Sequence, residues 1–297
     1  MIYKNWMSYI KDDVKLCNVV IPGAHNTGSY GMKKIACCQD GNLVQQFNYG
    51  IRYYCMRLDT VDGQIVQCHG LMKGEPFERS LIMLRRAILS TNSEFIIIDL
   101  REYYPQQLGP FHFKFHADPE AVDKLIEKYL EPEKYALTDF KNIADITMGD
   151  IRRSGKKYLL INHEEAYKYS VNCEIEAPWD KKIHGLKAKN FIKEAINFLD
   201  KDYSGLFWFQ TQQTPNLGTD IGFKTPRKLD KSLRPHFTEL IAEIAKDPKR
   251  LLKTNIIAGD FMTEDYMKVK EILNLNLLKN NVIESLKEEY RKGLAVV

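Results

Sequence analysis

Two histidines, an arginine and an aspartate have the residue types and positions needed for acid–base chemistry on a phosphate. His25 follows the apolar run VVIPGA, His69 follows IVQC, and Asp260 follows NIIAG, while Arg57 lies in the run IRYYCMRL. One imidazole can take a proton while the other gives one, and a guanidinium can stabilise charge on the phosphate oxygens. Together these four residues predict phosphoryl transfer.

The first of these segments, VVIPGAHNTGSY, predicts a strand that ends in a turn. We expect a strand from Asn18 to Ile21, broken by the Pro-Gly pair that follows it. His25 and Asn26 would then lie just beyond the carboxyl end of a strand, which is the active-site face in a barrel of parallel strands. A turn that simply contains a histidine is the alternative interpretation.

The second segment predicts a hairpin that brings Arg57 close to His69. Asp62-Gly63 is a strong signal for a two-residue turn, and it lies between the runs YYCMRLDTV and QIVQCH. The hairpin would place Arg57 and His69 near the ends of neighbouring strands.

Arg57 also has a structural alternative. Strand alternation places Cys55, Arg57 and Asp59 on one face. An inward arginine at a barrel mouth needs an anion or a carboxylate, so Arg57 could bind phosphate or form an ion pair with Asp59 or Asp99.

Asp260 can support a histidine or simply end a strand. A carboxylate at this place can fix a histidine's tautomer and stabilise its imidazolium form. The alternatives are a helix N-cap and a turn residue.

The elements that must position these residues alternate along the chain. Strands are expected at Asn18–Ile21, Ile51–Leu58, Gln64–Cys68, Phe95–Leu100, Tyr158–Ile161, Leu206–Gln210 and Asn255–Ala258. The helical patterns between them are PFERSLIMLRRAIL, PEAVDKLIEKYL, KNFIKEAINFL and HFTELIAEIAKD. Continuous apolar runs such as FIIIDL are typical of strands buried on both faces, and the alternation predicts parallel βαβ units. A barrel and an open doubly wound sheet both fit this pattern.

Two long irregular stretches interrupt the alternation, from Tyr103 to His116 and from Glu164 to Lys182. Such stretches in a compact domain are either functional loops or ordinary surface excursions.

The composition is that of an ordinary globular protein. The 297 residues are 44% hydrophobic and 28% charged, with a net charge of +4 that suits an anionic substrate or surface without requiring one. The six cysteines form no CxxC pair, so we expect free thiols rather than a zinc ribbon. No apolar run is long enough to span a bilayer, and no secretory signal is visible, so a cytoplasmic location is the default expectation and secretion is the alternative.

At these motifs the sequence resembles the catalytic X domain of phosphatidylinositol-specific phospholipase C. The resemblance rests on IPGAHNTG, GIRYYCMR, VQCHGL and AGDF, together with TMGDIRRSGKKYLLI before the middle strand. It extends from about Trp6 to Phe261, and the pairing of IPGAHNTG with CHGL is its most specific part.

The resemblance implies an α/β fold, a distorted (β/α)8 TIM barrel, in one catalytic domain over residues 1–297. By position, His25 resembles the general base that activates the inositol 2-hydroxyl, and Asp260 resembles the carboxylate that orients it. His69 resembles the general acid that protonates the diacylglycerol oxygen. Arg57 resembles the arginine that replaces calcium in the metal-independent bacterial enzymes, so no metal or other cofactor is expected.

Several positions depart from the bacterial pattern or align loosely with it. Asn26 and Cys55 each stand where bacterial members carry an aspartate. Asparagine cannot share a titrating proton, so His69 would act alone. Asn26 and Arg101, the basic residue after the third strand, resemble substrate-binding residues of the family. His163, Asp180 and Lys182, in the second half of the chain, align with its headgroup-binding positions only loosely.

The expected substrate is a phosphatidylinositol-like phospholipid, met by transient contact with a membrane surface and with no role for nucleic acid. Trp6, Met7, Tyr9 or the aromatic run from Phe207 to Phe209 could touch the bilayer, although core packing suits the latter run at least as well. Two other functions remain open. One is a metal-dependent glycerophosphodiester phosphodiesterase, against which Arg57 argues because such enzymes need acidic ligands. The other is a non-catalytic barrel that binds lipid or inositol phosphate.

Overall fold

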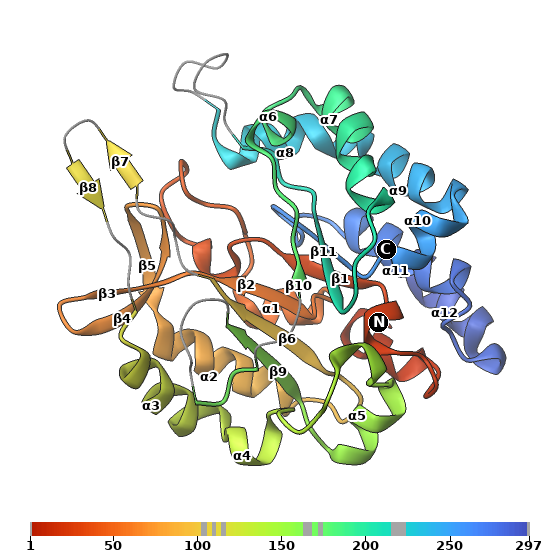
Figure 1. Ribbon diagram of the computed structural model, residues 1–297, viewed down its shortest axis with the longest axis horizontal. Coiled ribbons are helices and arrows are strands. Elements are labelled where there is room, and N and C mark those ends of the chain that lie inside the picture. The colour runs from red at the N-terminus through yellow and green to blue at the C-terminus, as the bar shows by residue number, and fades with distance from the viewer. Residues whose placement is uncertain are drawn as a thin grey trace.

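A curled sheet of seven parallel strands forms the centre of the molecule (Figure 1). The computed structural model describes residues 2–101, 106–108, 111–113, 117–162, 168–171, 175–214 and 224–295. The strands in spatial order are β10 (Ile175–Glu176), β11 (Leu206–Gln210), β12 (Ile256–Gly259), β1 (Ile21–Ala24), β2 (Tyr53–Met56), β6 (Ile96–Leu100) and β9 (Tyr158–Asn162). Every pairing between neighbours in this sheet is parallel.

Helices cover the outer face of this sheet, so the distorted (β/α)8 barrel that the resemblance implied is confirmed, and the open doubly wound sheet is not the fold. The α-helices are α1 (Leu43–Asn48), α2 (Phe77–Ile88), α3 (Pro119–Leu130), α4 (Pro132–Tyr135), α5 (Met148–Ser154), α6 (Lys181–His184), α7 (Ala188–Ala195), α8 (Pro226–Leu233), α9 (Phe237–Lys246), α10 (Pro248–Lys253), α11 (Met267–Leu278) and α12 (Lys287–Ala295). Short 3₁₀ segments include η1 (Ile2–Tyr9), η2 (Leu16–Asn18) and η3 (Thr27–Ser29).

Two small antiparallel sheets lie beside the barrel. The first contains β3 (Leu58–Val61), β4 (Gln64–His69) and β5 (Met72–Pro76), and the second contains β7 (Gln106–Leu108) and β8 (Phe111–Phe113). The predicted Asp62-Gly63 turn joins β3 to β4, with both residues at positive φ (49° and 75°), as this turn type requires.

The first predicted strand is displaced toward the carboxyl end. The expected strand Asn18–Ile21 is wrong, because β1 begins at Ile21 and includes the Pro-Gly pair that was expected to end it. The carbonyl of Pro22 still accepts a hydrogen bond from the Arg52 amide, at 2.9 Å. A Cβ on Gly23 would lie 2.7 Å from the Cβ of Ala258, so glycine is needed here for close strand packing rather than for a turn.

The expected strand Ile51–Leu58 is also divided. β2 ends at Met56 and β3 begins at Leu58, which leaves Arg57 at the junction between the barrel and the hairpin.

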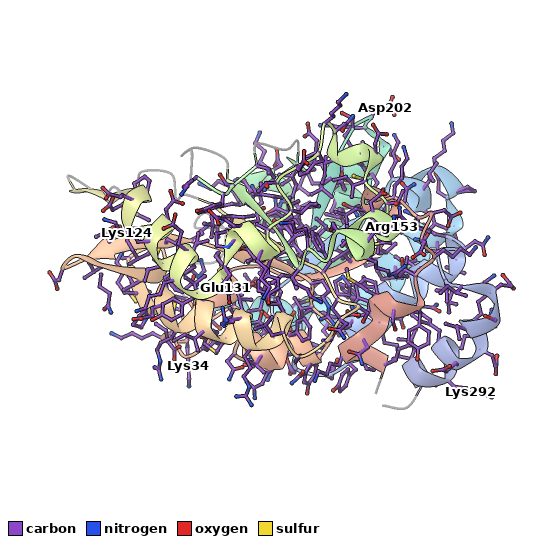
Figure 2. The ribbon with its side chains drawn as sticks, turned by 90° about the horizontal axis from the view of Figure 1, so that it is seen from below. Lys34, Lys124, Glu131, Arg153, Asp202 and Lys292 are labelled. Atoms are coloured by element: carbon purple, nitrogen blue, oxygen red, sulfur yellow. The ribbon has the colours of Figure 1, made fainter. Side chains whose placement is uncertain are left out.

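Most of the residues considered for membrane contact lie inside the protein, whereas Tyr9 is half-buried and its hydroxyl donates to Glu289. Trp6 and Met7 are fully buried, as are Phe207 to Phe209 on β11, so the prediction that these residues touch a bilayer is wrong. They fill the core instead. Figure 2 shows charged side chains such as Lys124 and Lys292 projecting from the outer helices. None of the described helices is both long and apolar enough to cross a membrane.

Candidate active site

Four strand ends bring the predicted catalytic residues to one edge of the barrel. His25 and Asn26 follow β1, Arg57 follows β2, and Asp260 follows β12. His69 is the last residue of β4 in the adjoining hairpin. Three of these strands neighbour one another in a parallel sheet, so their carboxyl ends meet at the same edge.

The strand register places His25 beside Asp260. Ala24 on β1 pairs with Gly259 on β12, and the His25 amide donates to the Gly259 carbonyl at 3.0 Å. The next residue on each strand therefore projects side by side, and His25 Nδ1 lies 2.8 Å from Asp260 Oδ1. When Asp260 is ionised, Nδ1 donates this bond and Nε2 keeps its lone pair.

Arg57 contacts the other ring nitrogen of His25. Its Nη1 lies 3.4 Å from His25 Nε2 and also donates to Oδ1 of Asn26. Asn26 adopts the left-handed conformation (φ 44°), which asparagine tolerates better than most residues. Asn26 therefore orients the guanidinium toward the reactive nitrogen of His25.

His69 faces His25 across a short gap. The two ring centroids are 6.4 Å apart, and the rings are nearly perpendicular, at 84°. His69 Nδ1 lies 2.7 Å from the carbonyl oxygen of Ala36. A carbonyl can only accept, so Nδ1 donates this bond and carries a proton.

Burial holds both imidazoles in the neutral form. It lowers the pKa of His25 well below its usual range, with further lowering from the nearby Arg57 guanidinium. Burial likewise lowers the pKa of His69 to about 4, against the opposing effect of the Ala36 carbonyl. Burial, with added repulsion from Asp230, raises the pKa of Asp260 to about 7. The two imidazoles thus carry no charge of their own beside Arg57, and an anionic ligand would raise the pKa of both.

A second arginine approaches the site over an aromatic side chain. Arg101 Nε donates to Asp99 at 2.9 Å, and its guanidinium lies over the ring of Trp208, 4.8 Å from the centroid. The same tryptophan ring is 6.2 Å from the His25 ring. Arg101 Nη2 is buried without a hydrogen-bond partner among the described residues, so this group can donate to a ligand oxygen.

The carboxylates considered as structural partners of Arg57 have cationic partners of their own. Asp99 is bonded by Arg101, and Asp59 by Lys73. Cys55 is a buried free thiol paired in register with Asp99.

The structure gives no contact between the two predicted catalytic histidines and the described residues among the loosely aligned headgroup positions, Asp180 and Lys182. Asp180 Oδ1 accepts from the amides of Lys182 and Ile183, which is the role of an N-cap on α6, and Lys182 is exposed. His163 lies outside the described residues. A headgroup role for these three residues stays a prediction.

Sequence reasoning missed Trp208 and Cys38 as parts of the site. Trp208 lies in an apolar run that is typical of a core strand, and nothing in the run shows that the Trp208 ring faces the site. Cys38 lies in the loop after η3, and its Sγ is 3.6 Å from His69 Nδ1. Among the described residues, His25, Cys38 and Asp260 also form a group whose possible metal-binding atoms lie within 4.8 Å of one another. Only the vicinal Cys37-Cys38 pair could have marked this loop.

Comparison with solved structures identifies the same fold in bacterial enzymes. A phosphatidylinositol-specific phospholipase C from Listeria monocytogenes aligns with a TM-score of 0.63 and 21% identity, over 92% of this chain and 98% of that one. A phosphatidylinositol-specific phospholipase C from Staphylococcus aureus aligns with a TM-score of 0.69 and 16% identity, over 92% and 97%. No family model matches the chain. At these identities the likeness establishes the barrel architecture.

Proposed function

We propose that this chain is a metal-independent phosphodiesterase that cleaves phosphatidylinositol or a related phospholipid to diacylglycerol and an inositol cyclic phosphate. The observation that carries the proposal is the facing pair of imidazoles, with ring centroids 6.4 Å apart and a guanidinium beside one of them. The fold shared with the two bacterial phospholipases adds support. We propose that residues 1–297 act as one catalytic domain.

The proposed reaction begins at His25. Its Nε2 takes the proton of the inositol 2-hydroxyl, whose oxygen then forms a bond to phosphorus. Attack by a hydroxyl of the same molecule needs no bound water and gains the advantage of proximity. Asp260 stabilises the imidazolium that forms, through the 2.8 Å contact with Nδ1.

His69 completes the step on the leaving side. As the bond between phosphorus and the glycerol oxygen breaks, Nε2 of His69 gives its proton to that oxygen and diacylglycerol leaves. His69 must therefore be protonated when substrate is bound. Its low pKa in the free protein would rise beside a phosphodiester anion, which favours the charged form.

Two guanidinium groups would neutralise the phosphate. Arg57 lies 3.4 Å from His25 Nε2, the nitrogen that takes the proton, and Arg101 has an Nη2 without a hydrogen-bond partner among the described residues. Guanidinium–phosphate bonds supply charge stabilisation without a cation.

We also propose contact with a lipid surface through exposed apolar side chains next to the site. Ile35 is 66% exposed and precedes the residue whose carbonyl bonds His69, while Leu71 is 40% exposed and follows His69 by two positions. Lys33 and Lys34 are exposed beside Ile35 and would be attracted to an anionic leaflet.

A lipid panel tests the reaction. Purified protein is mixed with vesicles of phosphatidylinositol, phosphatidylcholine or phosphatidylserine, with and without EDTA, and phosphorus NMR follows the products. We expect a cyclic inositol phosphate from phosphatidylinositol alone, at the same rate with EDTA. Loss of turnover in EDTA would indicate the metal-dependent alternative. Vesicle binding without turnover of any lipid would indicate the non-catalytic one.

The same vesicles test the membrane contact. Ile35→Ser and Leu71→Ser should each weaken co-sedimentation with phosphatidylinositol vesicles. Ile82→Ser is the control, because Ile82 is similarly exposed (47%) but lies on α2, outside the barrel. Equal losses in all three variants would contradict the assignment of this surface.

A further inference from the structure

The loop after η3 carries a thiol into the centre of the candidate site. Cys38 is 1% exposed, and Asn26 Nδ2 lies 3.8 Å from its sulfur. His69 Nδ1 is 3.6 Å from the same sulfur. The proposed reaction uses neither this thiol nor its position.

Three different metal-binding side chains converge around this thiol. His25, Cys38 and Asp260 each offer one ligand atom, and the three atoms lie within 4.8 Å of one another. In tetrahedral zinc sites the metal lies about 2.0–2.3 Å from such atoms, so neighbouring ligands are roughly 3.3–3.6 Å apart. The widest separation in the group must shorten by about 1 Å to reach that geometry, and His25 Nδ1 and Asp260 Oδ1, which are 2.8 Å apart, must separate by roughly half as much.

Hydrogen bonds connect the backbone segments that carry the three ligands. The Phe261 amide donates to the Cys38 carbonyl at 2.7 Å. The Gln39 side chain donates to the carbonyls of His25 and Gly259, at 2.8 and 2.9 Å. Small rotations of the side chains would therefore assemble the ligands without moving the loop.

The charges around the group define where a cation can enter. Arg57 contacts Nε2 of His25, and this guanidinium repels a cation on that side. Asp260 contacts Nδ1, and its carboxylate attracts one. Thiolate, imidazole and carboxylate together suit Zn²⁺, Co²⁺ or Cd²⁺ better than Mg²⁺ or Ca²⁺, which prefer oxygen.

We propose that His25, Cys38 and Asp260 form a binding site for a thiophilic divalent cation such as Zn²⁺, with water in the fourth position. The cation replaces the proton of the thiol, which passes to solvent, and it displaces the hydrogen bond between His25 and Asp260. Binding therefore strengthens as pH rises. Occupancy withdraws His25 from proton transfer, and this consequence alone rests on the proposed function.

Cobalt serves as the probe because a Co²⁺–thiolate bond absorbs in the near ultraviolet. The protein is stripped with EDTA, desalted without oxygen and titrated with CoCl₂, and ZnCl₂ is then added to displace the cobalt. We expect a thiolate charge-transfer band that saturates at one equivalent in the wild-type protein. Cys38→Ser should lose the band while keeping its circular dichroism spectrum.

Cys37→Ser is the matched control. Cys37 adjoins Cys38, but its Sγ lies 3.2 Å from the Gln39 carbonyl oxygen and is not part of the group. This variant should keep the band. Asp260→Asn should keep the band but weaken Co²⁺ binding about tenfold or more, since even outer-shell partners contribute about 10–100-fold. A wild-type protein without the band, or a band lost with Cys37 and kept without Cys38, would overturn the site.

Turnover provides the second readout. Zn²⁺ should slow phosphatidylinositol cleavage by the wild-type protein, and EDTA should restore it. Zinc binding that leaves the rate unchanged would overturn the inhibitory consequence. A metal-free protein that cleaves no lipid would end the proposed function, while the cobalt spectrum would still decide the metal site.

Discussion

The two histidines have different partners, and this difference assigns their roles. His25 Nδ1 faces a carboxylate, which stabilises positive charge on the ring, so His25 suits the residue that gains a proton. His69 Nδ1 faces a neutral carbonyl, which fixes the ring without stabilising the cation as strongly. His69 therefore suits the residue that gives its proton away.

The pKa of His69 makes a prediction about pH. Burial lowers it to about 4, so the protonated fraction of the free protein falls as pH rises above that value. His25, whose pKa is lowered well below its usual range, remains an unprotonated base over the same interval. Asp260 gains the negative charge that supports the His25 imidazolium as pH rises toward its pKa of about 7. The two changes offset each other below pH 7, so we expect kcat/KM to be level from roughly pH 5 to 7 and to fall about tenfold per unit above that, while kcat falls only at higher pH because the bound anion raises the His69 pKa.

Initial rates over a range of vesicle concentrations and pH values check this prediction. A kcat/KM that stays level up to pH 8 would contradict the requirement for a protonated His69 in the free protein.

At the scale of elements, β1 positions the base through a very close packing of strands. A Cβ on Gly23 would meet Ala258 at 2.7 Å and Tyr53 at 2.8 Å, both below normal contact distance. His25 follows two residues later, so any shift of β1 away from β12 also moves the imidazole from Asp260.

Gly23→Ala should therefore lower stability and turnover together. Overpacking of this kind costs about 1–3 kcal/mol in the free energy of unfolding. Gly155→Ala is the control: Gly155 ends α5 with open space around it, and alanine there should cost about 1–2 kcal/mol for its positive φ of 68° without changing turnover. Urea denaturation and initial rates measure both. A Gly23→Ala protein as stable as the wild type would contradict the packing argument.

The accuracy of sequence-based prediction differed between elements for physical reasons. The run LFWFQ and the helix from Pro119 to Leu130 were predicted with the correct bounds, because an apolar run and a clear N-cap at Asp118 define them locally. The bounds of β1 were wrong because Pro-Gly normally breaks a strand, and only the contacts with Tyr53 and Ala258 explain its presence here.

The residues of the candidate site could be predicted where they lie at strand ends, but not where they lie in loops. His25, His69 and Asp260 were found because each follows a recognisable strand, and Arg57 because it lies near the end of one. The structure brings all four together. The loop that carries Ala36 and Cys38 was not found, since its place beside His69 depends on tertiary hydrogen bonds such as that from Phe261.

At the scale of the whole molecule, the amino ends of the strands are held by a buried ion pair opposite the candidate site. Arg52 precedes β2 and Glu94 precedes β6, and both side chains are fully buried. Arg52 also donates to the carbonyls of Phe47 and Lys4, which ties η1 to the barrel. The buried ion pair that stabilises the fold and the candidate active site therefore lie at opposite ends of the barrel.

Glu94→Gln would leave the Arg52 charge buried without its partner. We expect a loss of about 3–5 kcal/mol in the free energy of unfolding, with turnover retained at temperatures where the variant is folded. Asp145→Asn removes the partner of Lys15 in an exposed pair, with side chains 47% and 71% accessible, and should cost less than about 1 kcal/mol. Equal effects of the two substitutions would contradict this view of the barrel's closed end.

The assignment of one base and one acid is tested most directly by changing the leaving group. His25→Ala and His69→Ala are each assayed on phosphatidylinositol and on an inositol nitrophenyl phosphodiester, whose nitrophenolate departs without a proton. On phosphatidylinositol, each variant should lose about 10²–10⁴-fold in rate. On the nitrophenyl ester, His69→Ala should recover most of its loss while His25→Ala should not. Equal losses for His69→Ala on both substrates, or recovery by His25→Ala, would contradict the account.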